Sequence, residues 1–457
     1  MRISRRTVLK GAAVLPFAAN SFGFSAAAQT SAAVPGMTEI PPILFAHGNG
    51  DHAPLWVTTL WRMESNGVPR DRMFAINFTD PLARSDDTKP EPNKSSTEDQ
   101  LRELGEAIKE LKRRTGAPRV ALVGNSRGGY SIRSYIKNGG AADVSHAVLC
   151  GVPNHGVFDW DDNLGNEYNG RGPFLRSLNA GDSEVTAGTA FLTLRSDNMD
   201  KYAQPDGRIL GKPGTPTGIS FDGPALKGAT NLVIGAVDHR ETAFSPRAFR
   251  EIYKFIVGRE PDRLAITPEA EVKLSGLVTG TPGGVQTNRP VSGAAVEVYR
   301  VSSDIGERMG EPIHSSQTGA DGRWGPAKVD PSWYLEIVLT SSGSITTHCY
   351  RSPFPRSSDI VHLRAARALG SADVGAGAVV LMTRPRGYFG LPRDVVLFDG
   401  KEPADVKSGV PTDAASTLRV SAAEVGRPIV ALFNHERIVA RAWPASENRI
   451  AVAELTY

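Results

Sequence analysis

Residues 120–131 read VALVGNSRGGYS. Four apolar residues favour a buried strand, and directly after it three glycines surround Ser126. The pattern Gly-x-Ser-x-Gly between a strand and a helix is typical of a strained turn that presents a nucleophilic serine. Such a turn leaves no room for side chains two residues before and after the serine. We therefore predict Ser126 to be a nucleophile; the alternative is a glycine-rich turn with a bystander serine.

The residues on both sides of this stretch predict an α/β fold. From about 41 to 261, apolar strand-like runs alternate with helical patterns. The clearest helix covers 96–116, where Thr97 and Gln100 have capping-box spacing and Gly116 ends the apolar stripe. Continuous apolar strands that alternate with helices indicate a mostly parallel sheet covered on both faces.

The C-terminal part has a different texture. Residues 268–457 are rich in Val, Thr, Gly and Pro, with short alternating runs and frequent turns. We expect a β-sandwich-like domain over 268–345, with a hairpin turn at Asp321-Gly322, and a second β-rich domain over 346–457. The predicted chain is therefore an α/β domain followed by all-β domains.

The N-terminus resembles a twin-arginine (Tat) export signal over residues 1–28. It has paired arginines, Arg5 and Arg6, a short apolar run and a small-residue site at 26–28. The alternative is an uncleaved amphipathic tail. The signal implies use of the Tat export machinery and a periplasmic or secreted protein. No later run reaches the 18 or so apolar residues of a membrane-spanning helix, so we expect no stable membrane insertion.

Composition narrows the possible partners. The chain has 457 residues and a net charge of +3, and residues 1–28 contain four basic residues and no acidic one. The remaining 48 basic and 49 acidic residues nearly balance. That balance gives no electrostatic footprint for nucleic acid. Cys150 and Cys349 are far apart in sequence, and buried free thiols are a better interpretation than a disulfide.

A serine nucleophile needs a base, and the base needs an acid that orients it. In folds that carry such a serine turn on a parallel sheet, the chain order is serine, acid, histidine. His239 follows the last apolar strand before the closing helix, which is the expected place for the base. The acid should follow the preceding strand, where Asp197, Asp200 and Asp206 are candidates.

Several stretches of residues 41–261 resemble the lipase branch of the α/β-hydrolases: HGNGD, GNSRGG, GVPNHG, FLRSLNAGD and TLRSDNMD. The resemblance extends to the acid loop, where Asp200 and Pro205 stand at matching spacing, and it implies that Asp200 is the acid. Two departures from the family pattern keep Asp197 as the alternative acid. Ala203 stands where a valine is usual, and one extra residue follows Ser196.

The resemblance also suggests an oxyanion hole. The AHGNGD stretch is similar to the His-Gly oxyanion loop of lipases and esterases, and it implies backbone donors at Asn49 and at Arg127, the residue after the nucleophile. His47 would then shape the loop and would not act as a base. The stretch YRSPFPRSSD is similar to the C-terminal β domains of archaeal-type lipases, where that region covers or lines the acyl site.

Three hypotheses for function follow. The first is an exported serine hydrolase, a lipase or carboxylesterase, that acts on an ester or lipid-like substrate through an acyl-enzyme on Ser126. The second is a polyester depolymerase with the same machinery, and the third is a catalytically silent binding or adhesion protein. We expect no cofactor and no metal, because no dinucleotide-binding glycine pattern follows a strand and metal-ligand clusters are sparse. Residues 157–180 could form a small lid.

Overall fold

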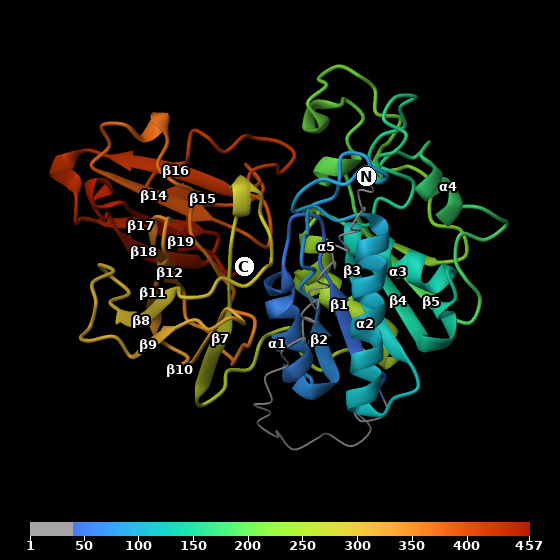
Figure 1. Ribbon diagram of the computed structural model, residues 1–457, viewed down its shortest axis with the longest axis horizontal. Coiled ribbons are helices and arrows are strands. Elements are labelled where there is room, and N and C mark those ends of the chain that lie inside the picture. The colour runs from blue at the N-terminus through green and yellow to red at the C-terminus, as the bar shows by residue number, and fades with distance from the viewer. Residues whose placement is uncertain (1–39) are drawn as a thin grey trace, which may run out of the picture.

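The computed structural model describes residues 40–457; the predicted export signal over residues 1–28 lies outside them. Two parts lie side by side (Figure 1). The first contains a sheet with helices on both of its faces, and the second consists almost entirely of strands. The predicted order, α/β followed by β-rich, is confirmed.

A six-stranded sheet forms the centre of the first part. Its strand order is β2-β1-β3-β4-β5-β6, and all neighbouring strands are parallel. The strands are β1 (Ile43–Ala46), β2 (Met73–Ala75), β3 (Val120–Asn125), β4 (Val144–Cys150), β5 (Ala190–Ser196) and β6 (Thr230–Ile234). The helices are α1 (Val57–Ser65), α2 (Thr97–Thr115), α3 (Arg127–Lys137), α4 (Pro173–Leu178), α5 (Glu241–Phe244) and α6 (Pro246–Val257).

Helices cover both faces of this sheet because its central strands, β1 and β3, are buried at every position and mainly apolar. Phe45 and Val123 share one apolar cluster with residues of α1 and α6. The adjacent strand residues, Leu44 and Leu122, point to the other face and pack with α2 and α3. Successive strand residues point to opposite faces, so a continuous apolar run buries both.

The start of α2 differs from the prediction. The capping box uses Ser96 and Asp99, one residue before the predicted pair Thr97 and Gln100. The sequence offers two overlapping capping-box pairs at this helix start, Ser96 with Asp99 and Thr97 with Gln100. The first pair forms, and the Ser96 side chain accepts the Asp99 N–H at 3.1 Å. Gly116 ends the helix as predicted, with a left-handed φ of 67°.

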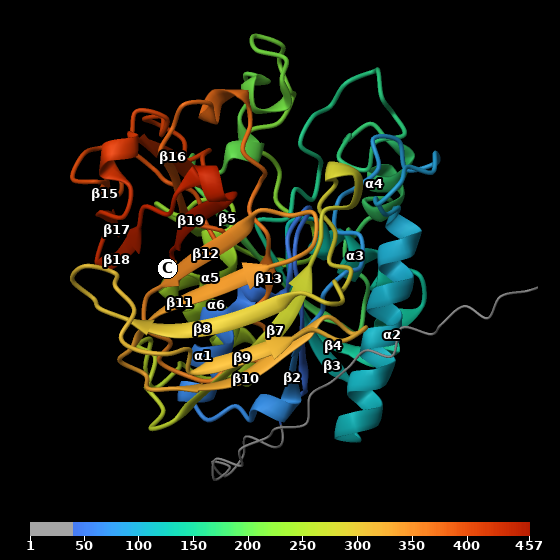
Figure 2. The same ribbon diagram turned by 60° about the vertical axis from the view of Figure 1, so that its left-hand side comes forward.

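The second part is built around a seven-stranded sheet with the order β16-β14-β19-β12-β11-β8-β9, flanked by two three-stranded sheets, β10-β7-β13 and β15-β17-β18 (Figure 2). The strands are β7 (Val272–Thr279), β8 (Ala295–Val301), β9 (His314–Gln317), β10 (Arg323–Val329), β11 (Tyr334–Thr340), β12 (Thr346–Arg351), β13 (Leu363–Arg364), β14 (Ala378–Thr383), β15 (Val396–Phe398), β16 (Ala415–Val420), β17 (Pro428–Phe433), β18 (Glu436–Arg441) and β19 (Arg449–Glu454).

This sheet corrects two predictions. The division at 345/346 does not separate two sheets, because β11 and β12 pair directly across it. The sequence between them is a short turn, and a turn signal does not reveal whether the next strand stays in the same sheet. Asp321-Gly322 does form a turn, but not a hairpin: β9 pairs with β8 and β10 pairs with β7.

The two parts share one apolar core. A single buried cluster contains Trp61 of α1, Phe249 of α6 and Leu335 of β11. Polar contacts also cross the seam, which is the interface between the two parts: the Trp61 indole donates to the Ser357 carbonyl at 3.0 Å. Both cysteines are buried and free.

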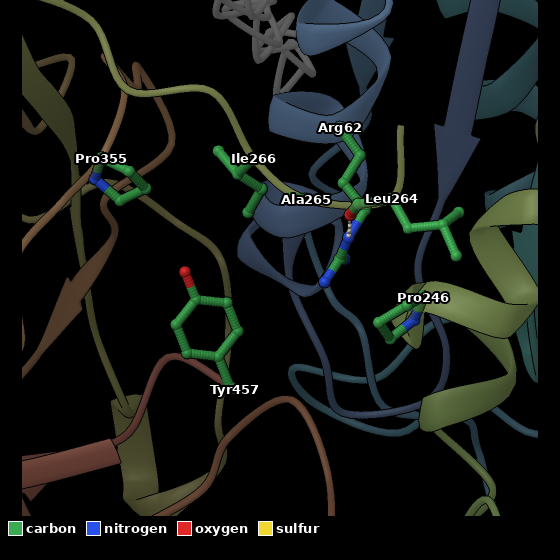
Figure 3. Close-up of a pocket in the computed structure, with 7 residues that line it drawn as sticks. All are labelled: Arg62, Pro246, Leu264, Ala265, Ile266, Pro355 and Tyr457. Carbon is green, nitrogen blue, oxygen red and sulfur yellow. Dashed lines mark hydrogen bonds between the residues drawn. The ribbon is translucent and has the colours of Figure 1, made fainter. Parts of the chain in front are cut away.

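A cavity of about 390 Å³ opens along this seam (Figure 3). Its walls come from both parts and include Arg62 of α1 and the C-terminal Tyr457. Arg62 is held by the Leu264 and Phe244 carbonyls, at 3.0 and 2.9 Å. None of the predicted site residues lines this cavity.

Candidate active site

Ser126 lies on a strained turn between β3 and α3. Its φ of 52° and ψ of −123° belong to a region that residues with a side chain rarely adopt. The Ser126 N–H donates to the Cys150 carbonyl of β4 at 3.0 Å, which ties the turn to the neighbouring strand. Strain at a residue held by its surroundings is typical of a functional position.

The surrounding glycines are required by close packing. A Cβ atom on Gly124 would lie 2.7 Å from the Ile132 side chain, and one on Gly128 would lie 2.5 Å from the Ala46 carbonyl oxygen. Both distances are shorter than van der Waals contact. The turn therefore forms only with glycine at these two positions, as the sequence predicted.

The structure brings His239 and Asp200 together. His239 follows β6, Asp200 follows β5, and the His239 Nδ1 lies 2.8 Å from Asp200 Oδ2. The other carboxylate oxygen accepts the Tyr202 N–H at 2.8 Å. His239 is 3% exposed, and its Nε2 atom has no hydrogen-bond partner among residues 40–457. An imidazole held at Nδ1 and free at Nε2 is the arrangement that a general base requires.

Asp197, the alternative acid, has other partners. Its Oδ2 accepts the N–H of Ala236 at 2.8 Å, and its Oδ1 accepts the N–H of Met199 at 3.2 Å. Ala236 has a left-handed φ of 55°. The Asp197 carboxylate therefore braces the loop after β6, while the carboxylate of Asp200 contacts the imidazole.

The two predicted oxyanion donors are Asn49 and Arg127. Asn49 and Ser126 line the same cavity, and the Asn49 side chain accepts the Ala83 N–H at 2.7 Å, which anchors the loop. Arg127 is the first residue of α3, and an N–H at that position has no intrahelical acceptor. Both backbone groups belong to segments that adjoin the serine.

His47 is a structural residue of the loop that contains Asn49. Its Nε2 accepts the Phe78 N–H at 3.1 Å, so its Nδ1 carries the proton and donates to the Gly48 carbonyl at 2.9 Å. Complete burial lowers the pKa of His47 to about 4. The ring is therefore neutral near pH 7 and fixes the loop by both of its nitrogens.

The side chain of Arg127 has a partner that the sequence did not reveal. Its guanidinium binds Glu167 through two hydrogen bonds of 2.6 and 2.7 Å, and both side chains are 1% exposed. It also donates to the Ser95 hydroxyl at 2.7 Å and the Ser95 carbonyl at 2.8 Å. Glu167 lies within the predicted lid, residues 157–180, so this ion pair anchors that segment to the nucleophile turn.

A cavity of about 230 Å³ lies over the candidate site. Ser126 and His239 form part of its wall, and the segment 157–180 supplies Phe158 and Tyr168. Sequence reasoning missed several other wall residues. These are Asp51, Tyr202, Leu210, Arg240 and, from the β-rich part, Tyr388.

A buried ion cluster fixes the loop that carries His239. Asp238, the preceding residue, is fully buried and accepts from the Arg384 guanidinium at 2.9 Å and from the Tyr388 N–H at 2.8 Å. Arg393 donates to Glu241 at 2.7 Å. The β-rich part thereby holds the residues on both sides of His239.

A second histidine–carboxylate pair lies elsewhere. In the β-rich part, His348 Nδ1 is 2.7 Å from Glu336, and its ring stacks on Trp443. Neither His348 nor Glu336 lines the cavity at Ser126. The geometry of the His348–Glu336 pair resembles that of the His239–Asp200 pair, but of these two pairs only His239–Asp200 lies beside the nucleophile turn.

Residues 40–457 contain no group of three or more His, Cys, Asp or Glu side chains that could hold a metal ion. No helix within these residues has the length and apolar character needed to cross a membrane.

The fold and this site define an α/β-hydrolase with a β-rich C-terminal part. Comparison with protein families agrees: residues 41–155 match the model described as Lipase (class 2), and residues 270–368 match Lipase C-terminal domain. The α/β part is thus similar to a class 2 lipase, and the β-rich part is similar to a lipase C-terminal domain. These families support the hydrolysis of carboxylic esters in general.

Individual proteins are only distantly similar to the chain in sequence. No curated protein matches the chain. Among solved structures, Bacillus licheniformis lipase BlEst2 in its propeptide form is 14% identical, with 88% of this chain and 93% of that chain covered and a TM-score of 0.35. The Listeria innocua lin2722 product is 19% identical (49% and 97% covered, TM-score 0.33). Aspergillus fumigatus lipase B is 13% identical (TM-score 0.35); the match covers half of this chain and only 56% of that one.

Proposed function

We propose that this chain is a serine carboxylesterase that works by two-step acyl transfer. The Ser126 Oγ attacks the ester carbonyl carbon, while His239 Nε2 takes the hydroxyl proton. The N–H groups of Asn49 and Arg127 receive the oxyanion. His239 then gives its proton to the leaving alkoxide oxygen, and the alcohol departs. Water attacks the acyl-enzyme by the same route and releases the acid and the free serine.

One observation carries the proposal: Asp200 holds the imidazole of His239 at Nδ1, its Nε2 has no hydrogen-bond partner among residues 40–457, and His239 lines the cavity that contains Ser126. A carboxylate at 2.8 Å selects the tautomer with the proton on Nδ1, which leaves Nε2 as the acceptor. It also stabilises the imidazolium that forms during attack. Asp200 is therefore the proposed acid of the triad.

The cavity size supports substrates with short acyl chains. Its volume of about 230 Å³ lies below the range of about 300–1,000 Å³ that is usual for drug-sized ligands. A protein cavity of about 150 Å³ accommodates benzene. About half of the wall residues are aromatic or aliphatic, among them Phe158, Tyr168 and Leu210, and such a surface accommodates a short acyl chain.

Replacement of the nucleophile tests the proposal. Hydrolysis of p-nitrophenyl esters of graded acyl length is measured for the wild type and for Ser126→Ala. We expect a loss of about 10³-fold or more in turnover, with circular dichroism unchanged. A folded Ser126→Ala protein with wild-type activity would refute the assignment. A polymer film assayed in parallel distinguishes a polyester depolymerase.

We also propose that the protein is exported through the Tat machinery. The support is the pair Arg5 and Arg6 before a short apolar run. Replacement of both arginines by lysine should keep the protein in the cytoplasm, as measured by cell fractionation and immunoblotting. A mature form that still appears in the periplasm of the double variant would contradict this proposal.

A further inference from the structure

Arg240 lines the cavity, and one edge of its guanidinium makes no hydrogen bond within residues 40–457. Its Nη1 donates to the Pro385 carbonyl at 2.8 Å. Among residues 40–457, Nε and Nη2 make no hydrogen bond; Nε lies 3.4 Å from Asp51 Oδ2, beyond the 2.7–2.9 Å of a charge-assisted bond. The side chain is 19% exposed and lines the cavity with Ser126 and His239. The Nε–Nη2 edge is the fork that pairs with a carboxylate.

The position of this edge is fixed before any ligand binds. The Arg240 guanidinium carbon lies 5.1 Å from the Tyr388 ring centroid, and the Pro385 carbonyl holds the opposite edge. Both contacts come from the segment that the ion pair between Arg384 and Asp238 attaches to the His239 loop. A side chain that is already ordered loses little entropy when it binds.

The charges around this edge leave a positive excess. Asp51 is 4% exposed, and its Oδ2 has no hydrogen-bond partner among the described residues. This one carboxylate acts on two guanidiniums, those of Arg240 and Arg364. Arg364 itself donates to the Thr287 carbonyl and the Asn288 side chain, which are neutral. Asp238 also acts on Arg240, but its carboxylate is already paired with the Arg384 guanidinium. Arg240 and Arg364 thus share the carboxylate of Asp51.

We infer that the cavity takes carboxylic esters that carry a second, free carboxylate, such as half-esters of short dicarboxylic acids. The free carboxylate would pair with the Nε–Nη2 edge of Arg240 while the ester carbonyl lies at Ser126. This inference rests on the proposed esterase function and names its substrate class. A five-carbon diacid such as glutarate suits a cavity of about 230 Å³, since a cavity of about 150 Å³ accommodates benzene.

The test compares two esters of the same shape. Monoethyl glutarate is compared with the isosteric ethyl ester in which an isopropyl group replaces the free carboxylate. The selectivity is the ratio of their kcat/KM values. In the wild type we expect the half-ester to be preferred, and Arg240→Gln should lower the ratio roughly ten- to hundredfold, since a charged hydrogen-bonding partner is lost.

Two further variants separate recognition from structural damage. Asp51→Asn removes the competing negative charge and should raise the ratio, opposite in sign to Arg240→Gln; general loss of folding cannot move the ratio in both directions. Arg247→Gln is the matched control, because Arg247 is exposed on α6. It should leave both the ratio and the activity unchanged.

Binding of free glutarate is measured by the rise in melting temperature that it causes, and this assay requires no turnover. If glutarate stabilises the wild type but not Arg240→Gln, the inference is supported even when neither ester is cleaved. The absence of cleavage would then refute only the esterase proposal. A wild type that prefers the neutral ester, a ratio unaffected by Arg240→Gln, or no stabilisation by glutarate would overturn the inference and leave the esterase proposal intact.

Discussion

Asp200→Asn tests the proposed acid more sharply than any other single change. Asp200 Oδ1 accepts the Tyr202 N–H at 2.8 Å, and Oδ2 lies 2.8 Å from His239 Nδ1. An asparagine would keep its only oxygen on the Tyr202 N–H and turn its NH₂ group toward Nδ1. Nδ1 would then have to accept, and the proton would move to Nε2. With Nε2 protonated, the imidazole cannot take the proton of Ser126.

The expected cost is large because nothing can replace the lost contact. His239 is 3% exposed, so water has little access to the ring. In a serine–histidine–aspartate triad, the corresponding amide lowers turnover by about four orders of magnitude. Turnover on a p-nitrophenyl ester, measured at saturating substrate, reports this loss, and circular dichroism checks the fold.

Asp197→Asn is the matched control. The Asp197 carboxylate accepts backbone N–H groups of Ala236 and Met199. An asparagine oxygen can keep one of them, so we expect a loss of about 1 kcal/mol in stability and turnover within a few-fold of the wild type. An inactive Asp197→Asn beside an active Asp200→Asn would refute the reasoning and move the acid by three positions.

Three other predictions concern the supports of the site. Glu167→Ala should lower the free energy of unfolding by about 3–5 kcal/mol in a urea titration, because it leaves Arg127 buried without its charge partner; a change below about 1 kcal/mol would contradict this. The folded-state pKa of His47, about 4, lies below its unfolded value of 6.5. The unfolded state thus binds more protons between these pH values, and stability falls as pH drops through this window. His47→Gln should remove about 3 kcal/mol of that fall; an unchanged pH dependence would show that His47 is not its source. Arg384→Met should lower both the melting temperature and turnover, since Asp238 would be buried without its guanidinium; wild-type values for both would argue against a role for the cluster.

The parts of the site that the sequence predicted are those set by local rules. The glycines around Ser126 follow from steric crowding within a few residues, and the order of serine, acid and histidine follows from the topology of a parallel sheet. Asp200 and Asp197 were harder to separate, since both follow the same strand. Only the loop geometry shows that Asp197 faces the Ala236 N–H while Asp200 faces the imidazole.

The missed residues depend on contacts between distant segments. Glu167 is forty residues from Arg127, and Arg384 is 146 residues from Asp238. Glu167 lies in an acidic loop whose composition is typical of a solvated surface, and no periodicity indicates that a guanidinium covers it. The division at 345/346 failed for a related reason, because sheet membership is decided by long-range pairing and the turn itself contains no signal for it.

The ion cluster at Asp238 explains why the β-rich part cannot be regarded as an independent appendage. Asp238 is fully buried, and the groups that compensate its charge come from the segment around Arg384 and Tyr388. A hydrolase part without that segment would leave Asp238 and Glu241 uncompensated on either side of His239. The buried charges would have to reach water, and the loop that carries the base would move with them. The same segment supplies the Tyr388 wall and holds Arg240, so the geometry of the base and the polarity of the cavity depend on one set of contacts across the seam.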